Sequence, residues 1–121
     1  MRFLIVDDSS TMRRIIINTL NKLGHADFVE AANGREGIER LAIGGVDMII
    51  TDWNMPEMNG IDFIKAVRST TNAKDVPVLM VTTNAAKDDI VEALRAGVNN
   101  YVVKPFTAET IKEKIDAVLA R

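Results

Sequence analysis

The sequence contains no cysteine and a single histidine, His25. The absence of cysteine excludes a disulfide framework, a thiolate nucleophile and a cysteine metal site, and it suits a reducing compartment. One histidine is too few for zinc sites that need several imidazoles, and it rules out most histidine-based acid/base schemes. Any chemistry of this chain must therefore use carboxylates, hydroxyls and amines.

Long apolar runs are also missing, since none approaches the roughly 20 residues that a membrane-spanning helix needs. Met1 and Arg2 lead directly into a short strand-like run instead of the apolar core of a signal peptide. We therefore expect a cytoplasmic protein without membrane insertion. The net charge of -2 lacks the positive excess of nucleic-acid binders, so we expect no nucleic-acid partner.

Short apolar runs alternate with segments whose apolar residues recur at helical spacing. The runs lie at residues 3–6, 48–50, 78–81 and 101–103, with a weaker one at 28–29. Continuous apolar strands are typical of a sheet covered on both faces, and their alternation with helices indicates parallel pairing. The length of 121 residues suits one domain, so residues 1–121 are expected to form a single three-layer α/β sandwich.

The segments between the runs predict which helical positions are buried. These positions are Met12, Ile15, Ile16, Leu20 and Leu23 in the first helix, Ile90 with Leu94 in the fourth, and Ile111, Ile115, Val118 and Leu119 in the last. Gly24 and Gly97 are expected helix stops, and Thr107 is an expected N-cap. Arg13 and Arg14 are expected on a solvated helix face, and His25 at the surface or in a turn.

Polar residues directly follow four of the apolar runs. They are Asp7 and Asp8, then Thr51 and Asp52, then Thr82 and Thr83, and finally Lys104. A single aspartate or threonine between a strand and a helix is often only an N-cap. In open α/β sheets, however, ligands bind outside the carboxyl ends of the strands. Carboxylates, a hydroxyl and an ammonium gathered at one sheet edge therefore form a candidate site.

The candidate site is suited to phosphoryl transfer. Crowded aspartates repel one another and stay ionised at neutral pH only if a cation or protons compensate. Oxygen ligands without histidine or cysteine select Mg²⁺, with Mn²⁺ as the alternative. Asp52 is the candidate nucleophile that would form an aspartyl phosphate. Thr82 and Lys104 would hold the phosphoryl oxygens, because this chemistry depends on positioning and charge stabilisation.

The same residues resemble a known family when they are taken in order. Asp7-Asp8, Asp52 with Met55-Pro56 and Gly60, Thr82, and Lys104-Pro105 resemble the receiver domains of two-component signalling. Residues 6–14, 51–56 and 101–106 are more closely similar to the receivers of bacterial chemotaxis. The resemblance covers the whole chain and implies a flavodoxin-like fold, with a five-stranded parallel sheet in the order 2-1-3-4-5 and five helices.

The resemblance also implies the metal ligands and the phosphoacceptor. Asp52 would accept the phosphoryl group from a histidine kinase. Mg²⁺ would be held by Asp8, Asp52 and the carbonyl of Asn54, with Asp7 acting through water.

Further roles at the site follow from the resemblance. Lys104 would be the phosphate partner, and the Lys104-Pro105 bond would be cis. Thr82 and Tyr101 would form the switch pair. Thr83 and Asn84 stand where enteric chemotaxis proteins carry Ala and Glu, so Asn84, near the site entrance, and Asn54 are candidates for tuning the lifetime of the phosphoryl group.

The function implied is that of a monomeric signalling protein and not an enzyme, although it assists its own phosphorylation and dephosphorylation. Its expected partners are a chemotaxis histidine kinase, the flagellar motor switch protein and a phosphatase. A stand-alone receiver in another phosphorelay is an alternative with the same chemistry. A metal-dependent phosphatase acting through an aspartyl phosphate is more remote, because such enzymes need a general acid that the motifs do not supply.

Overall fold

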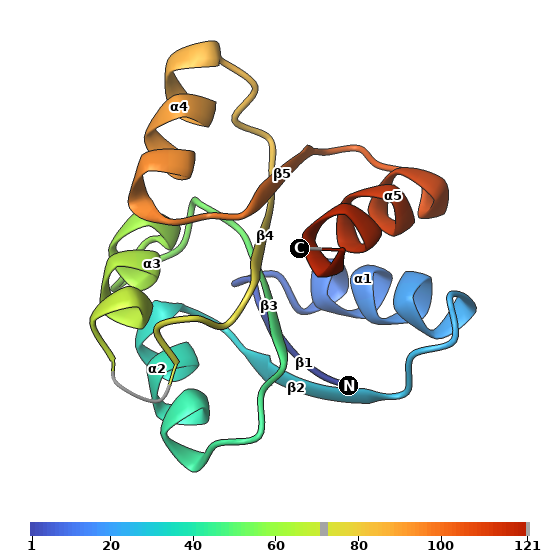
Figure 1. Ribbon diagram of the computed structural model, residues 1–121, viewed down its shortest axis with the longest axis horizontal. Coiled ribbons are helices and arrows are strands. Elements are labelled where there is room, and N and C mark those ends of the chain that lie inside the picture. Colours follow the sequence, from blue (N-terminus) through green and yellow to red (C-terminus); the bar gives the residue numbers. More distant parts are fainter. Residues whose placement is uncertain (71–72, 121) are drawn as a thin grey trace.

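The computed structural model describes residues 1–70 and 73–120, and in these residues five strands alternate with five helices (Figure 1). The strands are β1 (Arg2–Val6), β2 (Asp27–Ala31), β3 (Met48–Thr51), β4 (Val78–Thr82) and β5 (Asn100–Val103). The helices are α1 (Ser10–Lys22), α2 (Gly34–Ile43), α3 (Gly60–Ser69), α4 (Lys87–Ala96) and α5 (Ala108–Leu119). The predicted alternation of strands and helices is confirmed.

All strands of the sheet are parallel, and their order is β2-β1-β3-β4-β5, as the resemblance implied. The central strands β1 and β3 end level with each other, because Val6 pairs with Thr51. The pairing continues one step further, since the backbone N–H of Asp52 donates to the Val6 carbonyl oxygen at 2.9 Å. This register places the residues after β1 beside those after β3.

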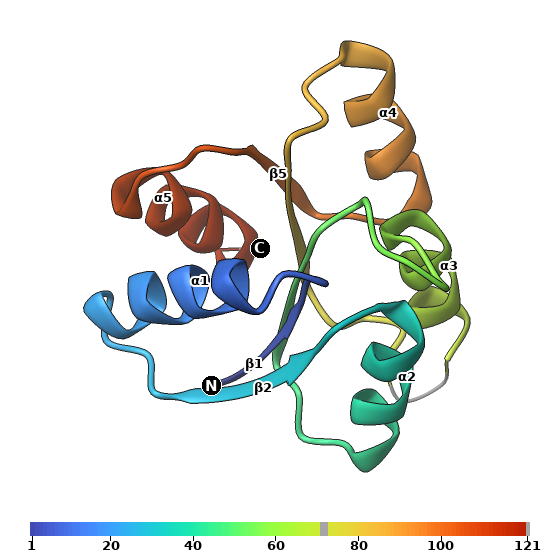
Figure 2. The same ribbon diagram turned by 180° about the vertical axis from the view of Figure 1, so that it is seen from behind.

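The helices cover the sheet on both faces. Helices α1 and α5 lie on one face, and α2, α3 and α4 lie on the other (Figures 1 and 2). Each face has its own buried apolar cluster. Strands β3 and β4 are buried along their whole length, which explains their uninterrupted apolar runs.

Strand β2, at one edge of the sheet, is the least buried of the five strands. Only Ala31 of this strand is fully buried, whereas Asp27 and Glu30 are exposed. An edge strand has a neighbour on one side only, so it tolerates charged residues that a central strand does not. The edge position accounts for the weaker apolar run at residues 28–29.

Most predicted helix contacts are confirmed, but three apolar residues were assigned to the wrong face. Ile15, Leu94 and Leu119 are 44%, 47% and 40% exposed. Each of them adjoins a buried residue, respectively Ile16, Ala93 and Val118. Successive residues of a helix point about 100° apart, so one of two adjacent apolar residues can face the sheet while the other faces solvent. Hydrophobicity alone does not decide which one it is.

The predicted helix ends are correct. Gly24 and Gly97 have φ angles of 99° and 117°, which favour glycine, and Gly97 directly follows α4. The side chain of Thr107 accepts a hydrogen bond from the N–H of Thr110 at the start of α5. In the part of the chain that is described, no helix has the length and apolar character to cross a membrane.

We predict that Ile16→Ala lowers the free energy of unfolding by about 2 to 5 kcal/mol, because it empties a buried position between α1 and the sheet. Ile15→Ala deletes the same atoms at the neighbouring exposed position and should change stability by about 0.5 kcal/mol or less. Urea denaturation followed by circular dichroism measures both. Equal losses for the two variants would contradict the observed face of α1.

Candidate functional site

The carboxyl ends of β1 and β3 bring together the three predicted aspartates. Oxygen atoms of Asp7, Asp8 and Asp52 all lie within 4.8 Å of one another. Asp7 is 2% exposed and Asp52 is 9% exposed, whereas Asp8 is open to solvent. The register of β1 against β3 produces this cluster, because both strands end at the same level.

Lys104 directly follows β5, at the same edge of the sheet, and its side chain reaches the cluster. Its Nζ atom donates to Oδ2 of Asp7 at 3.1 Å and to Oδ2 of Asp52 at 3.3 Å. The ammonium therefore bridges the two buried carboxylates. The positive charge of Lys104 and the negative charges of the carboxylates stabilise one another, because little water is present to screen them. One ammonium among three carboxylates still leaves an excess of negative charge.

Backbone N–H groups fix the orientation of both buried carboxylates. Oδ1 of Asp52 accepts from the N–H of Trp53 at 2.6 Å, and Oδ1 of Asp7 accepts from the N–H of Ser9 at 2.9 Å. Burial nevertheless raises the pKa of Asp7, outweighing the lowering effects of the Ser9 N–H and Lys104. Burial thus disfavours the ionised form of Asp7, and a cation bound nearby would favour it.

Gly60, the first residue of α3, packs closely against the backbone of Asp52 and Trp53. A Cβ atom at this position would overlap the carbonyl oxygen of Asp52 and would lie 2.7 Å from Cα of Trp53. The N–H of Gly60 donates to the Trp53 carbonyl oxygen at 2.7 Å. Only glycine permits this close approach, which accounts for its place in the motif.

The donor set fits a hard divalent cation. Carboxylate and carbonyl oxygens, without histidine or cysteine, are the ligands of Mg²⁺ or Mn²⁺. Asp8 is the most available carboxylate, since no residue in the described ranges donates a hydrogen bond to it. Both oxygens of Asp7, by contrast, already accept hydrogen bonds.

Asn84 joins three other predicted residues at the mouth of the site. Its side-chain oxygen accepts from Nδ2 of Asn54 at 2.8 Å. Its carbonyl oxygen accepts from the Tyr101 hydroxyl at 2.5 Å, and its N–H donates to Oγ1 of Thr82 at 3.4 Å. Thr82 is fully buried at the end of β4. The structure thus connects the loop after Asp52 to the predicted switch pair through one asparagine.

Tyr101 is buried, with 8% of its surface exposed. Burial raises its pKa to about 12, helped by the negative charges of Asp89 and Asp52. The Lys104-Pro105 bond is cis, as the resemblance implied. Trp53 is partly buried and packs against the core from the start of the loop after Asp52.

Two arginines make partly buried contacts that were not predicted from the sequence. Arg13 is not a solvated residue: its Nη1 donates to the Asp7 carbonyl oxygen at 2.6 Å. Arg68, on α3, donates to the carbonyl oxygens of Lys74, Val76 and Gly97 and to the side chain of Asn99. Nothing in the spacing of these arginines distinguishes them from surface residues. Arg14 is exposed as predicted, and His25 packs edge-on against Phe3 at a ring distance of 4.7 Å.

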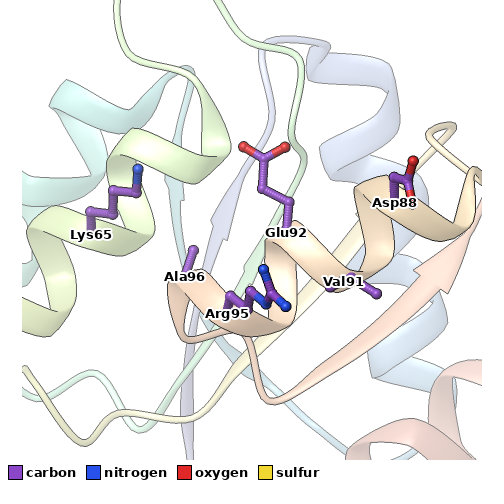
Figure 3. A pocket seen from close by; sticks show the side chains of 6 residues that line it. All are labelled: Lys65, Asp88, Val91, Glu92, Arg95 and Ala96. Carbon is purple, nitrogen blue, oxygen red and sulfur yellow. The ribbon is translucent and has the colours of Figure 1, made fainter.

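A pocket of about 480 Å³ lies elsewhere, between α3 and α4 (Figure 3). Lys65 from α3 faces a side of the pocket built by five residues of α4. Those residues are Asp88, Val91, Glu92, Arg95 and Ala96. None of the predicted site residues lines this pocket, so the candidate chemistry lies at the strand ends.

A comparison with protein families matches residues 3–116 to the response regulator receiver domain. The chain belongs to this receiver family. The predicted family and the flavodoxin-like fold of the receiver are thereby confirmed.

The relatives of this receiver come from chemotaxis. It is 55% identical over 120 residues to the chemotaxis protein CheY1 of Helicobacter pylori, covering 98% of this chain and 97% of that one. It is 54% identical over 121 residues to the chemotaxis protein CheY of Pseudomonas aeruginosa, covering 100% and 98%. The solved structure of CheY4 from Vibrio cholerae superposes with a TM-score of 0.89 at 37% identity, covering 97% of each chain. The receiver is a CheY-like response regulator of two-component signalling in chemotaxis.

We predict that tyrosinate absorbance of the native receiver rises with a midpoint near pH 12, because burial of the hydroxyl, helped by the negative charges of Asp89 and Asp52, disfavours the tyrosinate form. Tyr101 is the only tyrosine in the chain, so the signal is specific. A pKa raised on folding gives stability that is complete below about pH 10 and is lost as pH rises through 12. In urea the midpoint should fall to about 10. A midpoint near pH 10 for the native protein would contradict the prediction and indicate that the Tyr101 hydroxyl is exposed to solvent.

Proposed function

We propose that this receiver is phosphorylated on Asp52 by a chemotaxis histidine kinase in the presence of Mg²⁺ and then binds the flagellar motor switch protein to control rotation. The main support is the buried Asp52 carboxylate, which accepts a hydrogen bond from the Lys104 ammonium and lies beside two further aspartates. It would act in the cytoplasm as a monomer and not as an enzyme with a substrate of its own. A phosphatase is a further proposed partner.

The transfer step uses the fixed carboxylate of Asp52. One oxygen attacks the phosphorus of a phosphohistidine as the phosphorus–nitrogen bond breaks and the imidazole nitrogen keeps the electron pair. The Trp53 N–H and Lys104 hold the carboxylate in one orientation before attack. Lys104 would then follow the charge to a phosphoryl oxygen, and Thr82 would donate to another, because charge stabilisation dominates this chemistry.

The metal ion would be held by Asp8, Asp52 and the carbonyl of Asn54. When bound, it would neutralise negative charge that gathers on the phosphoryl group. Asp7, the most deeply buried of the three aspartates, is proposed to act through water. Asp8, which is exposed, is proposed as a direct ligand.

The partner surface is proposed to lie on α4, β5 and α5. Val91 and Leu94 on α4 and Val103 on β5 are 37%, 47% and 38% exposed, so these two elements offer apolar side chains to a partner. Phosphorylation would pull Thr82 toward Asp52, and the ring of Tyr101 would turn into the space that Thr82 leaves, which would reshape the surface formed by α4, β5 and α5. Asn54 and Asn84 are proposed to tune the lifetime of the phosphoryl group, since their hydrogen bond crosses the mouth of the site.

Two alternatives are less well supported. A phosphatase acting through an aspartyl phosphate would need a general acid near the nucleophile, but position 54 is an asparagine and the other aspartates follow a different strand. A receiver in another phosphorelay would have the same chemistry, but the similar proteins are named for chemotaxis. A pull-down with and without beryllofluoride would separate these functions by the partner that appears only in the activated state.

We predict that Asp52→Asn abolishes phosphate incorporation from a phosphorylated kinase while the protein remains folded, since Lys104 keeps its contact with Asp7. Intact-mass spectrometry measures the added phosphate, and circular dichroism measures the fold. Asp116→Asn is the matched control, because this exposed aspartate of α5 pairs only with Lys112 among the described residues. If Asp52→Asn incorporates phosphate at the wild-type rate, another residue is the phosphoacceptor.

We predict that Thr82→Ala still accepts phosphate at a measurable rate but loses most of the phosphorylation-dependent gain in affinity for a motor-switch peptide. Such coupling is typically worth about 5- to 150-fold. Thr83→Ala is the control, because the neighbouring threonine is exposed. Fluorescence anisotropy with a labelled peptide measures the gain. If Thr82→Ala and Tyr101→Ala both keep the full gain, the signal does not pass through this pair.

A further inference from the structure

Arg13 connects helix α1 to the backbone of the acidic cluster. It lies in the first turns of α1, where its N–H donates to the Ser9 carbonyl oxygen at 3.0 Å. Helical side chains lean toward the N-terminus of their helix, so Arg13 points back at the turn that leaves β1. There its Nη1 donates to the carbonyl oxygen of Asp7 at 2.6 Å, and its side chain is only 16% exposed.

A second contact fixes the other side of the guanidinium. Nε of Arg13 donates to Oε1 of Glu30 at 2.9 Å. Glu30 lies on β2 opposite Ile5 of β1, close to the point where β1 ends. The planar guanidinium is therefore held by a neighbouring strand while it binds the carbonyl, an arrangement that a flexible ammonium cannot reproduce.

The carbonyl that Arg13 holds belongs to the peptide unit between Asp7 and Asp8. This unit is rigid and planar, so fixing its oxygen also fixes where the chain continues into Asp8. The N–H of Asp7 donates to the Ala31 carbonyl oxygen at 3.1 Å, which anchors the other end of this residue. The Asp8 carboxylate accepts no hydrogen bond from any residue in the described ranges, so the backbone, which fixes where this side chain begins, is the constraint on where the carboxylate can reach.

We infer that Arg13 is a positioning residue for the metal ion, holding the Asp7–Asp8 peptide so that the Asp8 carboxylate faces Asp52. This inference rests on the proposed function, because it assumes that the aspartates hold Mg²⁺. Arg13 does not bind the ion itself: it carries a positive charge, which alone would repel a cation. Removing Arg13 would weaken Mg²⁺ binding if its positioning role dominates. Removing it would strengthen Mg²⁺ binding if only its positive charge mattered.

The decisive measurement is the Mg²⁺ affinity of the full chain by isothermal titration calorimetry at fixed ionic strength. Arg13→Ala should weaken binding about tenfold or more, the usual effect of losing a group that orients a metal ligand. Arg14→Ala removes the same charge from the adjacent exposed position and should leave the affinity unchanged or slightly increased. Arg13→Lys keeps the charge but loses the planar fork, so it should also bind Mg²⁺ more weakly than the wild type.

Two further readings separate this inference from a loss of folding and from failure of the proposed function. Thermal unfolding in chelator should show Arg13→Lys folded, and the rise in Tm on adding Mg²⁺ should be smaller than in the wild type. Arg13→Ala and Arg13→Lys binding Mg²⁺ as tightly as Arg14→Ala would overturn the positioning role alone. A wild-type chain that does not bind Mg²⁺ would overturn the metal site itself, and the role of Arg13 with it.

Discussion

Two buried carboxylates at the end of a sheet require a cation, and the rest of this site is arranged around that requirement. Asp7 and Asp52 lose most of their hydration, and the Lys104 ammonium provides the nearest compensation. The three residues follow three different strands, so they meet only when β1, β3 and β5 are aligned. The sheet register is thus also what assembles the charges.

The fold could be predicted largely because its signals are local. Uninterrupted apolar runs marked the strands that are covered on both faces, and Gly24, Gly97 and Thr107 marked helix ends through backbone geometry. The site could be predicted in part for a related reason: parallel strands place the residues after them on one edge. Helix faces were harder to predict, because Ile15 and Ile16 are the same residue type and only the packing distinguishes them.

The contacts of long polar side chains could not be predicted. Arg13 and Arg14 are chemically identical neighbours, yet one binds the Asp7 carbonyl and the other is exposed. Asn84 was predicted to lie near the entrance of the candidate site. Its simultaneous contacts with Asn54 and Tyr101 could not be predicted, because they depend on how two loops and β5 meet. Such contacts link segments distant in the sequence, and single-residue preferences carry no information about them.

Helix α4 is held unequally at its two ends. Its last turn runs into Gly97, whose carbonyl oxygen accepts two hydrogen bonds from the guanidinium of Arg68. Its first turn has no side-chain cap, since Ala86 stands at that position, and the preceding loop contains Asn84. The orientation of the last turn of α4 is therefore tied to α3 through Arg68, whereas that of its first turn depends on the loop that Tyr101 and Asn54 hold at Asn84.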